Sequence, residues 1–199
     1  MAISAQAIKG LRDQTGLGMM ECKTALEKND GDVSKALEYL KERGISMAAK
    51  KEGRAAFQGR ICSYIHFNGK VGVLLELNCE TDFVANTEVF QELAKNICLQ
   101  VCATSPMVVR REDLNPQTIE ELKAEYMQEV KGKPPEIAAK IVEGKLCKLF
   151  FSQKCLMEQV FIKDEKGTAT IKDLIKQAIA KVGENIVVSR FSRFEVGKQ

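Results

Sequence analysis

The first 43 residues place apolar side chains at helical spacing in three segments, which glycine-containing breaks separate. Ser4 can cap the first segment, which ends at the turn Thr15-Gly16-Leu17-Gly18, and the second runs from about Met19 to Lys28. Asp32 can cap the third, whose apolar stripe stops before Gly44. Three short amphipathic helices in this order predict one compact helical module.

The period of the apolar pattern changes to two after a small, basic segment at residues 47–54, which we interpret as a linker that could be extended or helical. Residues 61–67 alternate in the way typical of a half-buried strand, and residues 71–78 predict a second strand. Asn68-Gly69 lies between them and is the dipeptide that favours a type I′ hairpin turn. An antiparallel hairpin is therefore expected directly after the linker.

Helix-like segments return after the hairpin and alternate with proline- and glycine-rich breaks. We expect helices at residues 87–103, 115–130 and 172–182, and a last strand at residues 186–196. A further helix starts at residues 133–135 and carries Ile137, Ile141 and Val142, and the pattern leaves open whether it continues toward Phe151. The expected fold class is α+β, with a three-helix module followed by a core of a small antiparallel sheet and helices. We place the module at residues 1–46, the linker at residues 47–54 and the core at residues 55–199.

Composition limits the classes of function that the chain can have. It carries 30 basic and 27 acidic side chains, well interleaved, and no tryptophan, so neither a basic patch nor a base-stacking platform is predicted. We expect no direct contact with nucleic acid. The amino terminus lacks the features of a signal or transit peptide, and no apolar run approaches membrane-spanning length. The expected location is therefore the cytoplasm, without a membrane partner.

The seven cysteines are odd in number, scattered through apolar stretches and without a C-x-x-C pair. We interpret them as reduced core residues, and the lone histidine, His66, as a structural residue of a strand. No metal site and no cofactor are expected. The sequence holds neither a G-x-x-x-x-G-K-[ST] loop nor a G-x-G-x-x-G turn, and no nucleophile beside a histidine base. If the chain acts on a nucleotide, it acts through another protein and is not itself an enzyme.

Two segments resemble the signatures of the elongation factor Ts family. They are residues 11–23, Leu-Arg-Asp-Gln-Thr-Gly-Leu-Gly-Met-Met-Glu-Cys-Lys, and residues 78–86, Asn-Cys-Glu-Thr-Asp-Phe-Val-Ala-Asn. Residues 140–145 and 156–164 also look like that family, although Val160 stands where relatives commonly have proline. The resemblance covers essentially the whole chain and is to the short form of the family.

The resemblance implies a guanine-nucleotide exchange factor that binds the GTPase elongation factor Tu during translation elongation. Members of the family insert an Asp-Phe pair beside the magnesium and phosphate site of the GTPase, which releases GDP and allows GTP to bind. The matching pair here is Asp82-Phe83, between Thr81 and Val84. The same resemblance implies a ubiquitin-associated-like amino-terminal module that docks on the nucleotide domain through Leu11, Arg12, Met19 and Met20.

Other interpretations of the same residues remain open at this point. In residues 81–85, Asp82 could cap a helix and Phe83 could be core, and helical spacing places one of Met19 and Met20 in the core. The chain could instead tether an unrelated core to another partner, bind RNA in translation, or be a cysteine-dependent enzyme. The open edge of a single small sheet also invites pairing with a second copy, so a homodimer is expected.

Overall fold

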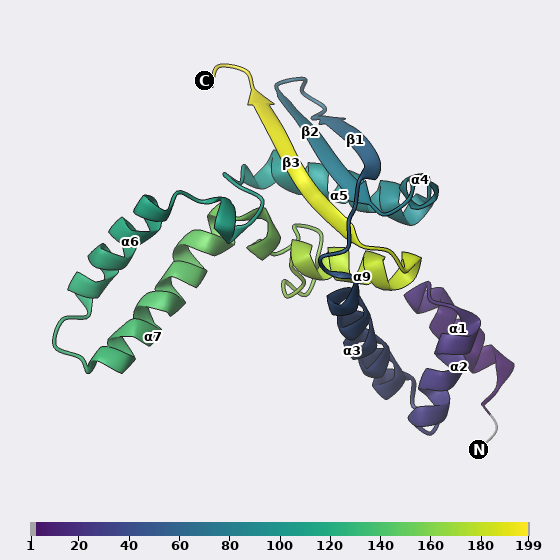
Figure 1. The fold of residues 1–199 in the computed structure, drawn as a ribbon. Coiled ribbons are helices and arrows are strands. Elements are labelled where there is room, and N and C mark those ends of the chain that lie inside the picture. Colours follow the sequence, from purple (N-terminus) through teal and green to yellow (C-terminus); the bar gives the residue numbers. More distant parts are fainter. Residues whose placement is uncertain (1–2, 199) are drawn as a thin grey trace. The chain divides into compact units, whose positions relative to one another are not determined.

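A computed structural model describes residues 3–198 (Figure 1). The chain falls into two compact units. The first unit contains the chain up to Gly59 together with residues 78–93 and 175–187. The second contains residues 60–77, 94–174 and the chain from Val188 onward. Both units are therefore built from segments that are far apart in the sequence.

The amino-terminal helices of the first unit begin and end largely where the sequence predicts. They are α1 (Ala5–Thr15), α2 (Met19–Lys28) and α3 (Val33–Lys51). The Ser4 side chain accepts a hydrogen bond from the amide of Ala7, and the Asp32 side chain accepts one from the amide of Lys35. The three helices share one apolar core, made of Ile8, Leu11, Cys22, Ala25, Leu26, Ala36 and Leu40.

Helix α3 is longer than expected, because it continues through Gly44 to Lys51 and takes in most of the predicted linker. Gly44 does not end the helix but allows a close approach to the carboxy-terminal helix of the same unit. A Cβ atom on Gly44 would lie 3.2 Å from the Cβ of Ala180, a tighter contact than most such atoms make. Ala48, one turn later, is buried. Gly44 is therefore explained by the close approach of Ala180 and not by the end of a helix.

The sheet has three antiparallel strands in the order β1 (Gln58–Ile65), β2 (Val71–Cys79), β3 (Ile186–Glu195). Strand β2 is central and alternates as expected, with Val73, Leu75 and Leu77 buried on one face. Within the second unit the sheet contacts helix α5 (Glu88–Thr104): the Nε of Arg193 on β3 donates to the Cys102 carbonyl of α5 at 3.3 Å. The expected α+β class is confirmed.

The hairpin between β1 and β2 is not the type I′ turn that Asn68-Gly69 predicts. A type I′ turn needs positive φ at both central residues, but only Gly69 has one, at 68°. The loop runs from Phe67 to Lys70 and is closed by the amide of His66, which donates to the Val71 carbonyl at 2.8 Å. The Asn68 side chain instead accepts the Lys70 amide at 3.0 Å, which fixes the turn without a left-handed asparagine.

Helices make up most of the rest of the chain. The remaining elements are α4 (Asp82–Ala85), α5 (Glu88–Thr104), η1 (Arg111–Asp113), α6 (Pro116–Glu129), α7 (Pro135–Lys145), η2 (Leu146–Phe151), α8 (Ser152–Lys154), η3 (Leu156–Glu158) and α9 (Ile171–Val182). In the second unit α6 and α7 lie side by side, and α7 continues through a π-helical segment, η2, into α8 (Figure 1). No helix among residues 3–198 combines the length and the apolar character needed to cross a membrane.

Candidate functional site

The segment that resembles the second family signature forms a single exposed helical turn, α4, just after β2 ends. Thr81 caps this turn: its backbone is extended, with φ −129° and ψ 156°, and its Oγ1 accepts the amide of Val84 at 3.4 Å. Asp82 is the first residue inside the turn. The interpretation that Asp82 caps the helix is therefore wrong, because threonine holds that position and leaves the aspartate side chain to project.

Of the four residues of the turn, the first two are exposed to solvent and the last two are buried. Phe83 is 79% exposed, whereas Val84 and Ala85 are buried. The interpretation of Phe83 as a core residue is therefore wrong. The Asp82 carboxylate is also exposed, and within residues 3–198 it accepts no hydrogen bond and forms no ion pair. An unpartnered carboxylate beside an exposed phenyl ring is a pair of groups available to another molecule.

Two glutamates hold the start of this turn by a reciprocal pair of contacts with the chain after α9. Glu184 accepts the amide of Thr81 on Oε2 at 3.0 Å and the Thr81 hydroxyl on Oε1 at 2.7 Å. In return Glu80 accepts the amide of Asn185 on Oε1 at 2.7 Å. Each segment thus donates a backbone amide to a carboxylate of the other.

Asn185 and Arg54 complete the support. Asn185 is buried, and its Nδ2 donates to the Arg54 carbonyl at 2.8 Å. The Arg54 guanidinium lies 3.6 Å from Oε2 of Glu80 and so balances part of the negative charge. The sequence predicts no supporting role for any of these four residues, although Glu80 belongs to the signature segment at residues 78–86. Gly183 does mark the end of a helix and so places Glu184 in a loop, but nothing local indicates a partner about a hundred residues away.

Cys79, the last residue of β2, donates its thiol to the Thr81 carbonyl at 3.0 Å. Burial raises the pKa of this thiol, and the nearby Glu184 carboxylate raises it further. The thiol therefore keeps its proton at neutral pH and can serve as a donor. Cys79 is a structural part of the turn, in agreement with its interpretation as a reduced core cysteine.

The four residues expected to dock the amino-terminal module differ in accessibility. Arg12 is exposed on α1, and Met19 and Met20 at the start of α2 are 44% and 71% exposed, so neither methionine is core as helical spacing suggested. Leu11 is only 1% exposed and belongs to the module core. Leu11 therefore offers almost no surface to a partner while the module is folded.

The turn between α1 and α2 belongs to the same compact unit as α4. Gly16 closes α1 with φ 69°, and a Cβ there would lie 3.4 Å from Cε of Lys181. Lys181 lies in the last turn of α9, three residues before Glu184. Lys181 at the end of α9 thus lies close to the turn after α1, and Glu184, just beyond α9, holds the start of α4.

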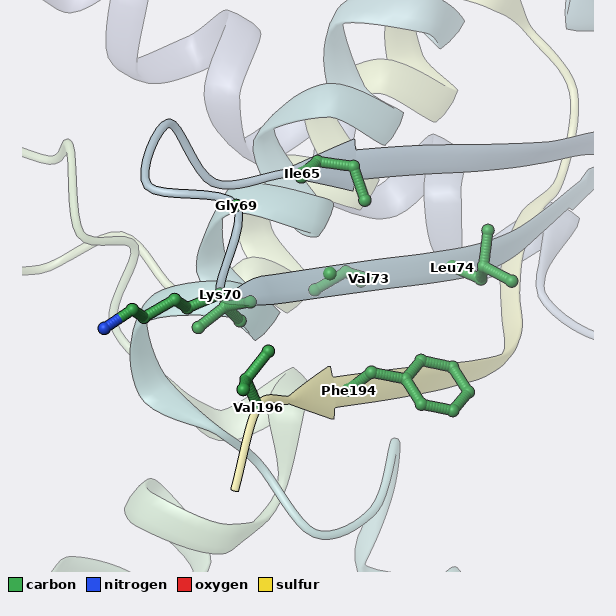
Figure 2. A pocket seen from close by; sticks show the side chains of 9 residues that line it. Ile65, Gly69, Lys70, Val73, Leu74, Phe194 and Val196 are labelled. Atoms are coloured by element: carbon green, nitrogen blue, oxygen red, sulfur yellow. The ribbon is translucent and has the colours of Figure 1, made fainter. Parts of the chain in front are cut away.

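A second candidate surface is the outer face of the sheet in the second unit. Ile65, Leu74, Phe194 and Val196 line a groove of about 360 Å³. Lys70 lies at its border, with the side chain directed away from these four residues (Figure 2). Gly72 deepens the groove, because a Cβ there would lie 3.1 Å from Cδ1 of Ile65. All four apolar side chains are exposed. An apolar hollow of this kind on the water-facing side of a sheet is typical of a surface that another protein covers.

Among residues 3–198, no three histidine, cysteine, aspartate or glutamate side chains gather as a candidate metal site. His66 lies beside Tyr64, whose hydroxyl is 3.2 Å from Nδ1 of the imidazole.

Comparison with known proteins gives a consistent answer. The family model described as elongation factor TS matches residues 27–169. The chain is 56% identical over 198 residues to elongation factor Ts of Thermosipho melanesiensis, covering 98% of this chain and 100% of that protein. It is 53% identical over 199 residues to that of Thermotoga neapolitana, covering all of both chains, and 54% identical over 198 residues to that of Thermotoga maritima, covering 100% of this chain and 98% of the other. The chain belongs to the elongation factor Ts family.

Proposed function

We propose that the chain is the guanine-nucleotide exchange factor for elongation factor Tu in translation elongation and acts in the cytoplasm. The observation that carries the proposal is the turn α4, on which Phe83 and the unpartnered Asp82 project from a capped and anchored backbone. Family membership supports the same function. The factor needs no covalent chemistry of its own, because it changes how tightly another protein holds a nucleotide.

Asp82 and Phe83 enter the GTPase beside its Mg²⁺ and phosphate site. Mg²⁺ demands near-ideal octahedral coordination, so a wedge that shifts its ligands weakens the hold on GDP strongly. Phe83 supplies the apolar bulk, and Asp82 fixes the register or alters the charge balance near the ion. Linkage is reciprocal: the factor loosens GDP by the same ratio by which GDP loosens the factor. Incoming GTP then displaces the factor.

The amino-terminal module, residues 1–46, provides the docking surface for the nucleotide domain. Arg12, Met19 and Met20 form that surface, since all three are exposed and lie on either side of one turn. Methionine side chains are flexible and fit apolar patches of varied shape. Leu11 contributes from the core by fixing α1.

A second copy of this chain covers the groove on the outer face of the sheet. The open edge of the sheet already predicts a homodimer, and the groove adds a largely apolar surface next to that edge. An interface with two-fold symmetry uses the same surface on both copies, so that surface must be complementary to itself. Here the exposed Phe194 of one copy can enter the groove of the other. Sedimentation equilibrium tests this: the wild type should have twice the chain mass of 22.1 kDa, and Leu74→Glu should give the monomer. A monomeric wild type at micromolar concentration would reject the dimer.

Stopped-flow release of a fluorescent GDP from purified elongation factor Tu tests the exchange function. The protein at micromolar concentration should accelerate release by orders of magnitude, and an Asp82→Ala/Phe83→Ala double variant should lose the acceleration. Phe57→Ala is the matched control, because Phe57 is an equally exposed phenylalanine of the same unit outside the turn. No acceleration by a folded wild-type sample would reject the proposed function.

A further inference from the structure

The reciprocal contacts at the start of α4 are stronger than ordinary turn contacts. Hydrogen bonds from an amide or a hydroxyl to a carboxylate are charge-assisted and about twice as strong as neutral ones. Glu184 accepts two of them from one residue, Thr81, at 3.0 and 2.7 Å. Thr81 in turn caps the single helical turn that carries Asp82 and Phe83. One carboxylate therefore holds the residue on which the orientation of the turn depends.

Glu184 is itself held firmly on both sides. Gly183 closes α9 with φ 76°, and its amide donates to the Ile179 carbonyl at 2.8 Å. On the other side Asn185 is buried and bound through both its backbone amide and its side-chain amide. A carboxylate between two anchored residues has little freedom to follow Thr81 if the turn moves.

We propose that Glu184 is a positioning residue for nucleotide exchange: its carboxylate fixes Thr81, and through Thr81 it fixes the direction in which Asp82 and Phe83 enter the partner. The inference rests on the proposed function and adds the residue that keeps the wedge rigid. An isolated four-residue helical turn has little stability of its own. The turn can displace the ligands of a bound ion only if Thr81, at its start, stays fixed.

Glutamine is the conservative test of this role. The side-chain oxygen of Glu184→Gln can still accept the Thr81 amide, and its NH₂ group can donate to the Thr81 hydroxyl oxygen. Glu184→Ala removes both contacts. We expect Glu184→Gln to keep most of the exchange activity and Glu184→Ala to lose most of it, whereas loss of negative charge as such would affect both variants equally.

The first measurement is GDP release from elongation factor Tu at increasing concentration of each variant. Glu184→Ala should lower the maximal release rate about tenfold, because it removes two hydrogen bonds that are solvent-exposed and so contribute less than buried ones. The half-saturating concentration should change much less. Glu42→Ala, on the exposed face of α3 in the same unit, should match the wild type. An unchanged maximal rate in a folded Glu184→Ala protein, or a glutamine variant as impaired as alanine, would overturn the inference.

A second measurement needs no GTPase and so separates this inference from the proposed function. The chain has no tryptophan, so Phe83→Trp introduces a single fluorescent reporter on the turn. Time-resolved anisotropy should show a larger fast component when Glu184→Ala is added to Phe83→Trp, and Glu184→Gln should restore the slow decay. Equal decays in all three proteins would overturn the inference even if wild-type exchange is normal. If the wild type does not accelerate GDP release, the proposed function fails whatever the anisotropy shows.

Discussion

The amino-terminal module and the turn α4 are held in opposite ways. Every cap of the module lies within four residues of the amide it serves, and its core comes from 33 consecutive residues, Ile8 to Leu40. The turn α4 has only four residues, and the contacts that hold its base reach Glu184 and Asn185, 103 and 105 positions away. Contacts between residues close together in the chain can be recognised in the sequence. Contacts between distant residues are seen only in the folded structure.

Leu11→Ala should produce the largest effect, because it creates a cavity in a core that only short helices surround. We expect the module to lose about 3 kcal/mol of stability. Urea denaturation followed by circular dichroism measures it. The neighbouring exposed residue is the control, since Arg12→Ala should change stability by less than about 0.5 kcal/mol. Equal stability of the two variants would show that the module core does not depend on local packing.

Phe83→Ala should leave stability unchanged and impair exchange. A buried aromatic wedge in a complex is worth about 2 kcal/mol, so the maximal rate of GDP release should fall about thirtyfold. Affinity for the GTPase, measured by calorimetry without nucleotide, should fall less, because a wedge acts chiefly on the distorted state. Equal losses of rate and affinity would mean that Phe83 only adds binding energy.

Asn185→Ala should loosen α4 without loosening α1, which tests the difference between the two regions directly. The variant leaves the Arg54 carbonyl without its donor, at a cost of about 1–2 kcal/mol. Amide hydrogen exchange should become faster at Thr81 and Val84 and stay the same at Ile8 and Leu11. Faster exchange by the same factor in both places would mean that they open as one cooperative unit.

Ser4→Ala should have the smallest effect, about 1 kcal/mol, because it removes one side-chain cap. The loss should be confined to the first turn of α1, which exchange of the Ala7 amide reports. Ser34→Ala, on the exposed first turn of α3, is the matched control and should change little. Faster exchange at Thr81 in the Ser4 variant would contradict the independence of the two regions.

The sequence alone determined the elements of this protein and its family. Capping residues, glycine breaks and the change of period from 3.6 to two predicted α1, α2, β2, β3 and α9 to within about one residue, whereas β1 begins three residues earlier than predicted. Those signals succeed because each acts between residues close together in the chain. The two signature segments predicted the family, which the comparisons confirm.

Only the tertiary structure decided what the individual residues do. Gly44 resembles a helix stop but lies inside α3, because Ala180 packs against it. Leu11 and Phe83 are both apolar residues of signature segments, yet one is core and the other projects. Burial depends on which distant segments pack against a residue. Neither the spacing of apolar residues nor their helix propensity contains that information. For the same reason the partnership of Thr81 with Glu184 could not be predicted: it joins two short polar segments, and only the folding of the hundred residues between them brings the carboxylate to the hydroxyl.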